Sequence, residues 1–280
     1  MLNGLDLFSG IGGNSLALAP WVNTVAYCER EPHAQAVLLS RMREGLLPSR
    51  PIWDDVSSLR GEWLPPIDII IGGFPCQDIS VAGKGAGLVN GKRSGLFYEI
   101  SRLAEEVEPT FLFLENVPAI RTRGLDAVIE ELTRLGYDLR WTMLSAEEVG
   151  APHKRNRWFC LAAHSERVEL RLKQGRSSGT DREGTIESRL DGAKGNVADS
   201  MSKRLSQRYV SSGAREENGT FTRGKFSRAN ATNNGIWTVE PDVGRVANGI
   251  SLRVDRLKRL GNAVVPLQAR EAFKELMGIE

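Results

Sequence analysis

The sequence predicts an α/β fold in which helices cover a largely parallel β-sheet. A short apolar strand at residues 2–8 is followed by a glycine turn and by a helical pattern at residues 15–18. The apolar run at residues 69–71 stops at two glycines, as expected for a strand buried on both faces of a parallel sheet. Residues 111–114 form another such run. The length of 280 residues allows one large domain, or a domain with a smaller appendage.

Strands and helices alternate along most of the chain, and turn residues separate them. The hydrophobic fraction of 41% is enough to bury a substantial core. A loop with two adjacent carboxylates is expected at residues 52–56. We expect strands at residues 2–8, 22–27, 69–71, 111–114, 137–144 and 158–163, and helices at residues 15–18, 33–43, 96–107, 125–135 and 266–277.

The middle of the chain differs in composition from the rest. Residues 165–234 are rich in Ser, Gly, Arg, Asn and Thr and show no regular periodicity. Residues 1–164 carry a net charge of −4, whereas residues 165–239 carry +5. This basic block indicates a polyanion partner, although an ordinary solvated surface is an alternative. We expect a small loop-rich lobe at 165–243, between two parts of one catalytic domain at 1–164 and 244–280.

Cys76 stands where the strand at residues 69–71 has just ended. Ligand sites of such sheets lie beyond the carboxyl ends of the strands. Gly72 and Gly73 allow a sharp turn, and Pro75 fixes the backbone just before the thiol. This placement suits a nucleophile, and a small buried cysteine is the alternative.

The glycine-rich turn at residues 6–13 predicts a site for a nucleotide-type cofactor. It joins the first strand to the first helix, as such sites do, but it is not the G-x-G-x-x-G fingerprint. Glycines also serve plain tight turns. Glu29 follows the second strand, where it is suited to accept hydrogen bonds from a ribose diol. A surface carboxylate is the other interpretation of Glu29.

Further polar groups are expected at the same edge of the sheet. Glu115 follows the strand at residues 111–114. Arg155 and Arg157 lead into a later strand, so their alternation puts both side chains on one face, unless they are plain surface cations. The segment 80–94 is rich in Gly, Lys and Arg. We expect it to be a functional loop that closes on a phosphate backbone rather than a plain surface loop.

Together these motifs resemble those of the DNA (cytosine-5) methyltransferases of the bacterial and phage type. Residues 6–13 resemble the first family motif, 73–77 the nucleophile motif, 115–117 the acid motif and 261–264 the last motif, in the family's order. The resemblance covers most of the chain outside the basic block. It implies a Rossmann-like, S-adenosylmethionine-dependent methyltransferase sheet with a small loop-rich target-recognition lobe.

The resemblance also implies roles for individual residues. Cys76 is the expected nucleophile, which adds to a cytosine flipped out of the duplex. Glu115 is expected to contact N3 of that cytosine, and Arg155 and Arg157 to hold the catalytic side and O2 of the ring. The family often has Gln where this chain has His153. The implied cofactor contacts are Phe8 on the adenine, the backbone at Gly10 and Gly12 near the methionine part, Glu29 on the ribose, Asp55 and Val56 at the adenine edge, and Pro75, Leu96 and Asn262 completing the pocket.

The implied partner is double-stranded DNA, with a cognate restriction endonuclease as a further partner and a monomeric state. Methylation of tRNA by the same fold and motifs is the closest alternative. A catalytically silent nucleic-acid-binding protein is disfavoured, because Cys76, Glu115 and both arginines are present. A stand-alone cofactor-binding module would not need the thiol.

Other features of the sequence bound its location and its metal chemistry. Without a signal peptide or a long apolar run, we expect a cytoplasmic protein that does not enter a membrane. The three cysteines form no disulfide pattern. The three histidines are too scattered for a zinc site, so no metal is expected.

Overall fold

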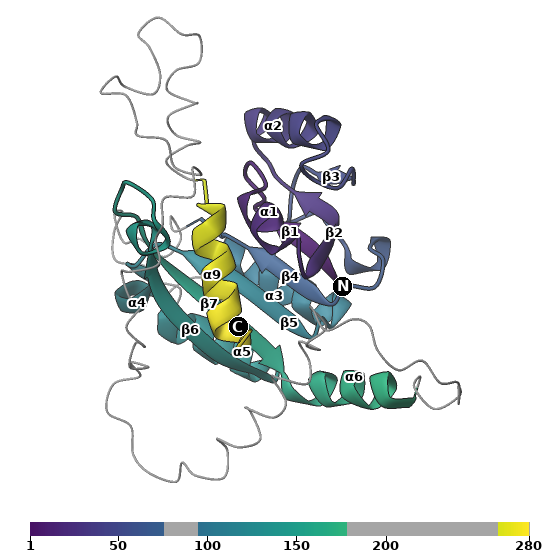
Figure 1. Cartoon of the computed structure of the whole chain (residues 1–280). Coiled ribbons are helices and arrows are strands. Elements are labelled where there is room, and N and C mark those ends of the chain that lie inside the picture. The colour runs from purple at the N-terminus through teal and green to yellow at the C-terminus, as the bar shows by residue number, and fades with distance from the viewer. Residues whose placement is uncertain (76–94, 178–262, 280) are drawn as a thin grey trace, which may run out of the picture.

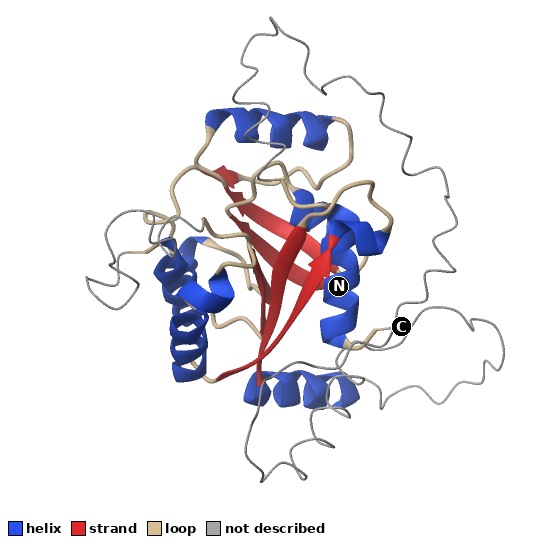
Figure 2. Ribbon diagram, turned by 90° about the vertical axis from the view of Figure 1, so that its left-hand side faces the viewer, coloured by secondary structure: helices blue, strands red, loops and turns tan. Residues whose placement is uncertain are grey.

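The computed structural model describes residues 1–75, 95–177 and 263–279. They form a seven-stranded sheet with the order β3-β2-β1-β4-β5-β7-β6 (Figures 1 and 2). The strands from β3 to β5 are parallel, whereas β7 is antiparallel to both of its neighbours, β5 and β6. The predicted α/β class, with a Rossmann-like, largely parallel sheet, is confirmed.

Most elements lie within a residue or two of the predicted positions. The strands are β1 (Leu2–Leu7), β2 (Val22–Cys28), β3 (Ile52–Trp53), β4 (Ile69–Gly72), β5 (Phe111–Asn116), β6 (Tyr137–Ser145) and β7 (Asn156–His164). The α-helices are α1 (Gly13–Leu18), α2 (Pro32–Arg43), α3 (Leu96–Val107), α4 (Ile120–Arg123), α5 (Leu125–Arg134), α6 (Ser165–Ser177) and α9 (Pro266–Met277), and the 3-10 helices are η1 (Gly61–Trp63) and η3 (Ala146–Val149).

Helices cover both faces of the sheet, which explains why the isoleucines of β4 do not alternate with polar residues. Ile70 packs in the core on the side of α3 and α5, whereas Ile69 and Ile71 pack in the core on the side of α1 and α9 (Figure 1). Successive side chains of a strand point to opposite faces, so a strand covered on both sides needs apolar residues throughout. Within the described ranges, no helix is both long and apolar enough to cross a membrane.

Two predicted boundaries were wrong. Residues 52–56 were expected to be a loop, but Ile52 and Trp53 form β3, which pairs with the end of β2. Glu115 was expected to follow its strand, but β5 continues to Asn116 because the antiparallel neighbour β7 pairs with it that far. Both differences arise from pairing with a neighbouring strand, which local composition does not report.

Residues 165–177 were expected to be irregular, but they form α6. Its Arg171 contacts Asp68, which immediately precedes β4, and the Arg167 guanidinium donates to the Tyr137 hydroxyl at 3.1 Å. Because β7 runs antiparallel to β5, α6 begins at the amino ends of the parallel strands, the edge opposite the one that Cys76 follows. The rest of the expected lobe, residues 178–243, lies outside the described residues.

Candidate active site

Glu115 is the buried acid at the carboxyl end of the sheet. Its side chain is only 11% exposed, and Oε1 lies 2.7 Å from Nε of Arg157. On the paired strands β5 and β7, Glu115 is opposite Phe159, so Arg157 is its diagonal neighbour. Burial raises the pKa of Glu115, and the attraction of Arg157 and Arg155 only partly opposes this effect. The site therefore favours the protonated carboxyl more than water does.

Arg155 approaches the same carboxylate from the residues that lead into β7. Its Nη2 donates to the carbonyl oxygen of Ala263 at 2.6 Å, which ties it to the segment before α9. Burial and the nearby cation of Arg157 lower the pKa of Arg155 from its ordinary value. The structure thus brings Glu115, Arg155 and Arg157 together, as the sequence predicts.

Gly73 places the segment that leads to Cys76 beside Glu115. In the register of β4 and β5, Gly72 is opposite Leu114, so Gly73 and Glu115 follow side by side. A Cβ atom built on Gly73 would lie 3.1 Å from Oε2 of Glu115, which is tighter than ordinary contact. Any larger residue here would push against the carboxylate.

The next residue, Phe74, is anchored in the core. It is 3% exposed, and its ring lies 5.3 Å from that of Phe97. Its carbonyl accepts a hydrogen bond of 3.2 Å from the side-chain amide of Asn116, the neighbour of Glu115. The half-buried Pro75 follows, and Cys76 itself lies outside the described residues. Phe74, two residues before Cys76, is thus held beside the residue that follows Glu115.

The other two cysteines are unsuited to nucleophilic chemistry. Cys28 is 2% exposed and Cys160 is fully buried. Burial raises the pKa of Cys28 to about 12 and also raises the pKa of Cys160. A reactive cysteine must be an accessible thiolate. Among the three cysteines of the chain, Cys76 is therefore the candidate nucleophile.

The turn after β1 has an unusual backbone. Phe8, Gly10 and Gly12 have φ angles of 53°, 55° and 80°, in the left-handed region. For a residue other than glycine this conformation stores roughly 1–3 kcal/mol of strain, and such residues cluster at ligand sites. A Cβ atom on Gly10 would meet nothing closer than a carbonyl oxygen 4.0 Å away, whereas one on Gly12 would clash with Leu47 at 2.5 Å. Gly12 therefore leaves little room for a side chain, whereas Gly10 faces open space.

Glu29 is fixed against this turn. Its Oε2 accepts a hydrogen bond of 2.7 Å from the backbone N–H of Gly10, and its Oε1 accepts one of 2.8 Å from Glu31. Each carboxylate oxygen has two lone pairs, so capacity remains for the two hydroxyls of a ribose. The residues present therefore fit a nucleoside-type cofactor at this edge.

The other expected cofactor residues differ in burial and in their hydrogen-bond partners. Asp55 accepts hydrogen bonds from the backbone and hydroxyl of Ser57 at 3.0 and 2.7 Å, and these bonds lower its pKa. The side chain of Val56 is in the core, and its carbonyl accepts from Arg102 at 2.9 Å. Leu96 is half-buried at the first turn of α3, and Asn262 lies outside the described residues.

Sequence reasoning missed two buried polar residues near the site. Asp6, in β1, is 1% exposed and accepts a hydrogen bond of 2.5 Å from the hydroxyl of Ser15 in α1. Burial raises its pKa to about 7. Gln268, in α9, is fully buried between apolar neighbours on the same face of the helix. In each case the available signal was a polar residue in an apolar strand or helix face.

The buried Asp6 predicts a pH-dependent stability. Its folded pKa of about 7 lies above the ordinary value of 3.8 for an aspartate, so the folded state binds the proton more tightly. Asp6 therefore lowers the free energy of unfolding as the pH rises from about 4 to about 7, by roughly 2–4 kcal/mol. Asp6→Asn should remove this decline, as measured by urea unfolding at pH 4.5, 6 and 8. Asp138→Asn, at an exposed strand position, is the control. Parallel pH curves for Asp6→Asn and the wild type would contradict the prediction.

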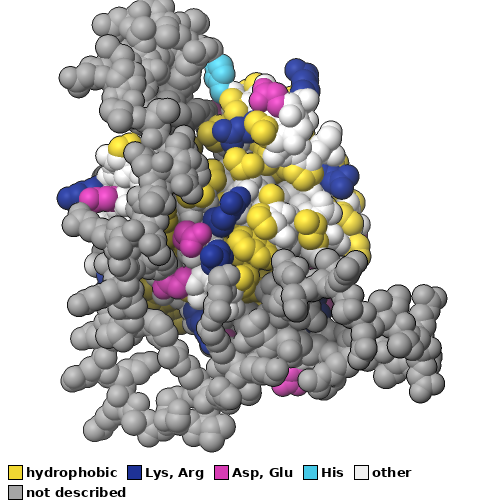
Figure 3. All heavy atoms as spheres, in the orientation of Figure 1, with side chains coloured by type: hydrophobic (Ala, Val, Ile, Leu, Met, Phe, Trp, Pro, Cys, Tyr) yellow, Lys and Arg dark blue, Asp and Glu magenta, His cyan; other side chains and the backbone are white. Residues whose placement is uncertain are grey.

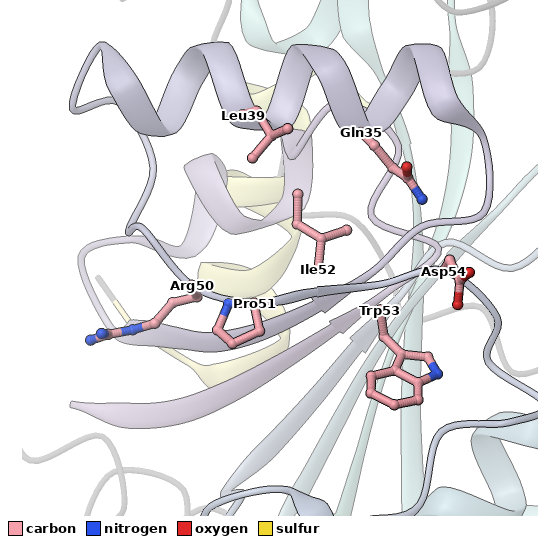
Figure 4. Close-up of a pocket in the computed structure, with 7 residues that line it drawn as sticks. All are labelled: Gln35, Leu39, Arg50, Pro51, Ile52, Trp53 and Asp54. Atoms are coloured by element: carbon pink, nitrogen blue, oxygen red, sulfur yellow. The ribbon is translucent and has the colours of Figure 1, made fainter.

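A cavity of about 520 Å³ lies between α2 and β3 (Figure 4), and two of its lining residues contact Glu29. The side-chain amide of Gln35 donates to the Glu29 carbonyl at 2.6 Å, and the Trp53 carbonyl accepts from the Glu29 N–H at 2.9 Å. Figure 3 shows hydrophobic side chains on the surface in this part of the molecule, and Leu39 of α2 is 44% exposed. The cavity contains none of the predicted site residues. Across the described ranges no group of three or more His, Cys, Asp or Glu side chains is arranged to hold a metal ion. Seven residues line the cavity: Gln35, Leu39, Arg50, Pro51, Ile52, Trp53 and Asp54.

Comparison with known proteins agrees with the fold and the motifs. The family model for C-5 cytosine-specific DNA methylase matches residues 2–240, so this chain belongs to that family. The Type II methyltransferase M.CviJI of Paramecium bursaria Chlorella virus IL3A is 35% identical over 164 residues, which cover 58% of this chain and 43% of the relative. M.MspI of Moraxella sp is 30% identical over 213 residues, covering 74% of this chain and 48% of the relative.

Among solved structures, the Dnmt2 methyltransferase of S. pombe is similar to this chain, with 22% identity and a TM-score of 0.48. The match covers 67% of this chain and 59% of that one. The chain spans about half the length of the curated relatives that it matches. The predicted resemblance to the family is confirmed by the family match.

Proposed function

We propose that this chain is a DNA (cytosine-5) methyltransferase that uses S-adenosylmethionine to methylate a flipped-out cytosine in a specific duplex sequence. The observation that carries the proposal is the buried Glu115, paired with Arg157 and placed beside the segment that leads to Cys76. The family match and the names of the relatives, which are Type II methyltransferases, support it.

The proposed mechanism assigns one chemical task to each residue. The Cys76 thiolate adds to C6 of cytosine, which gives C5 the electron density of a carbanion. A proton from Glu115 at N3 offsets this charge, and the raised pKa of Glu115 keeps that proton available. S-adenosylmethionine, when bound, supplies the methyl group that C5 takes. A bound water then takes the C5 proton, the Cys76 thiolate departs, and N3 returns its proton to Glu115, which restores the aromatic ring.

The arginines and the cofactor residues position these reacting groups. Arg157 holds the Glu115 carboxyl in place, and the guanidinium of Arg155 is held by its hydrogen bond to the carbonyl of Ala263. Phe8, Glu29 and the open side of Gly10 form the part of the cofactor site at the turn after β1. Asp55, Val56, Pro75 and Leu96 complete this edge, together with Asn262 at the end of the undescribed segment.

The region 165–243 is proposed to recognise the target. Its excess of five basic residues over acidic ones, counted to residue 239, suits contacts with phosphates, which give affinity that falls with salt. Base-edge contacts from the same region would set the sequence. The association with a restriction endonuclease, the monomeric state and the cytoplasmic location remain predictions.

A methyl-transfer assay on two nucleic acids tests the proposal. The purified protein is incubated with tritiated S-adenosylmethionine and either unmethylated genomic DNA or bulk tRNA. Label should enter the DNA, and bisulfite sequencing of that DNA should place it on cytosines within one short motif. Label in tRNA alone would favour the RNA alternative, and label in neither would overturn the proposed activity.

Glu29→Ala is expected to weaken binding of S-adenosylmethionine more than binding of DNA. The loss of a charge-assisted hydrogen bond to the ribose is worth roughly 1.5–3 kcal/mol. Isothermal titration calorimetry of the cofactor measures this effect, and Glu62→Ala, at an exposed position of η1, is the control. An unchanged cofactor affinity would show that Glu29 serves only to brace the turn at Gly10.

A further inference from the structure

A single buried side chain connects the C-terminal helix to the arginine segment. The Gln268 amide nitrogen donates hydrogen bonds to the carbonyl oxygens of Leu144 and Arg155, at 2.7 and 2.6 Å. Leu144 lies near the end of β6, and Arg155 lies just before β7. Both hydrogens of the amide are therefore used, and the opposite amide orientation would set oxygen against two oxygens. Gln268 thus ties together the two ends of the connection between β6 and β7.

The same C-terminal segment also holds the side chain of Arg155. The Arg155 guanidinium donates to the carbonyl oxygen of Ala263, five residues before Gln268. The Arg155 carbonyl accepts a second hydrogen bond, of 3.2 Å, from the backbone N–H of Ala146 in η3. Arg155 is thus held at its backbone by Gln268 and Ala146, and at its guanidinium by Ala263. Both Gln268 and Ala263 come from a part of the chain more than a hundred residues away.

This connection sets the geometry of the catalytic pair. Arg157 is two residues after Arg155 on the same strand segment, and it pairs with Glu115 at 2.7 Å. A shift of the Arg155 backbone would move the start of β7, and with it Arg157, the ion-pair partner of Glu115. Misplacement of about 1 Å is enough to reduce a reaction rate by about 100-fold.

We propose that Gln268 is a positioning residue: it fixes the β6–β7 connection so that Arg155 and Arg157 meet Glu115 and the target cytosine. It acts through the Arg155 carbonyl and touches no reactant. This inference rests on the proposed methyltransferase activity. Gln268 lies in the C-terminal helix α9, outside all of the family motifs found in the sequence, the last of which ends at residue 264.

The test compares three variants of the full chain. Gln268→Met keeps the length and volume of the side chain but has no donor. Gln268→Asn keeps the amide on a stem that is one carbon shorter, so it reaches one carbonyl at most. Arg270→Met is the matched control, because Arg270 of the same helix donates to a backbone carbonyl at Ala17 of α1, away from the arginine segment. All variants are assayed at a temperature at which circular dichroism shows them folded.

The measurements separate positioning from general stability. With unmethylated genomic DNA as substrate, Gln268→Met should lower kcat by about 10- to 100-fold and leave the KM for S-adenosylmethionine within about twofold. The kcat of Gln268→Asn should lie between those of Gln268→Met and the wild type. If Gln268→Met does not fold, the test relies on Gln268→Asn. Arg270→Met should retain kcat within about threefold while it lowers the melting temperature.

A combined variant shows whether Gln268 acts by placing the two arginines. If it does, Gln268→Met should reduce kcat much less in a background that carries both Arg155→Lys and Arg157→Lys than in the wild type. Equal losses in both backgrounds, or a wild-type kcat in folded Gln268→Met or Gln268→Asn, would overturn the inference while leaving the proposed function intact. A wild-type protein that transfers no methyl group to DNA would instead overturn the proposed function, and the inference with it.

Discussion

Replacing Cys76 by serine is expected to abolish methyl transfer while leaving the binding of S-adenosylmethionine largely intact. A serine hydroxyl is far less acidic than a thiol, so it does not supply the nucleophile that must add to C6. Filter-binding assays with tritiated cofactor and unmethylated DNA measure the transfer, and calorimetry measures the cofactor affinity. Cys160→Ala is the control, because this buried thiol is not proposed to react. Substantial turnover by Cys76→Ser would refute the assignment.

A covalent trap tests the same assignment directly. DNA that contains 5-fluorocytosine blocks the loss of the proton from C5, so the enzyme should remain attached to the base. Peptide mass spectrometry should then place the adduct on Cys76. An adduct on Cys28 or Cys160 would contradict both the assignment and the burial of these two thiols.

Glu115→Gln is expected to lower kcat by about 10²–10⁴-fold, the usual contribution of a general acid. The amide offers a hydrogen bond to N3 but does not transfer a proton there. It also leaves Arg157 without the carboxylate that it contacts at 2.7 Å. Cofactor affinity should change little, because Glu115 contacts the arginines and the Gly73 segment.

Glu115→Asp is the matched variant, since it keeps the carboxyl group on a shorter stem. It should recover part of the activity that Glu115→Gln loses. The wild-type kcat should fall at high pH, and the falling limb should lie above the ordinary range of a glutamate, because burial raises the pKa of Glu115. A kcat for Glu115→Gln within threefold of the wild type would show that the proton at N3 comes from elsewhere.

The sequence alone determined the fold class, and it predicted the edge of the sheet at which we propose that the chemistry occurs. The apolar run before Gly72 and the glycine turn before α1 are local patterns, since each depends on a few neighbouring residues. The positions of Glu29, Glu115 and Cys76 just after such runs predicted one common edge, because parallel strands end together, and the structure places Glu29 and Glu115 there.

The tertiary structure decided which of these groups touch. The pairing of Arg157 with Glu115 depends on the register of β5 and β7, which no local pattern specifies. The strand β3 exists because β2 pairs with it, and α6 is held by Arg171 and Arg167 against the far edge of the sheet. Each of these features depends on an interaction between distant segments.

Gln268 shows this division most clearly. In the sequence it is one polar residue in an amphipathic helix, and nothing beside it indicates a task. In the folded chain its amide lies within hydrogen-bonding distance of the carbonyls of Leu144 and Arg155, which are 124 and 113 residues away. Local propensity decides that α9 is a helix, whereas the packing of α9 against β6, β7 and η3 decides what its buried face holds.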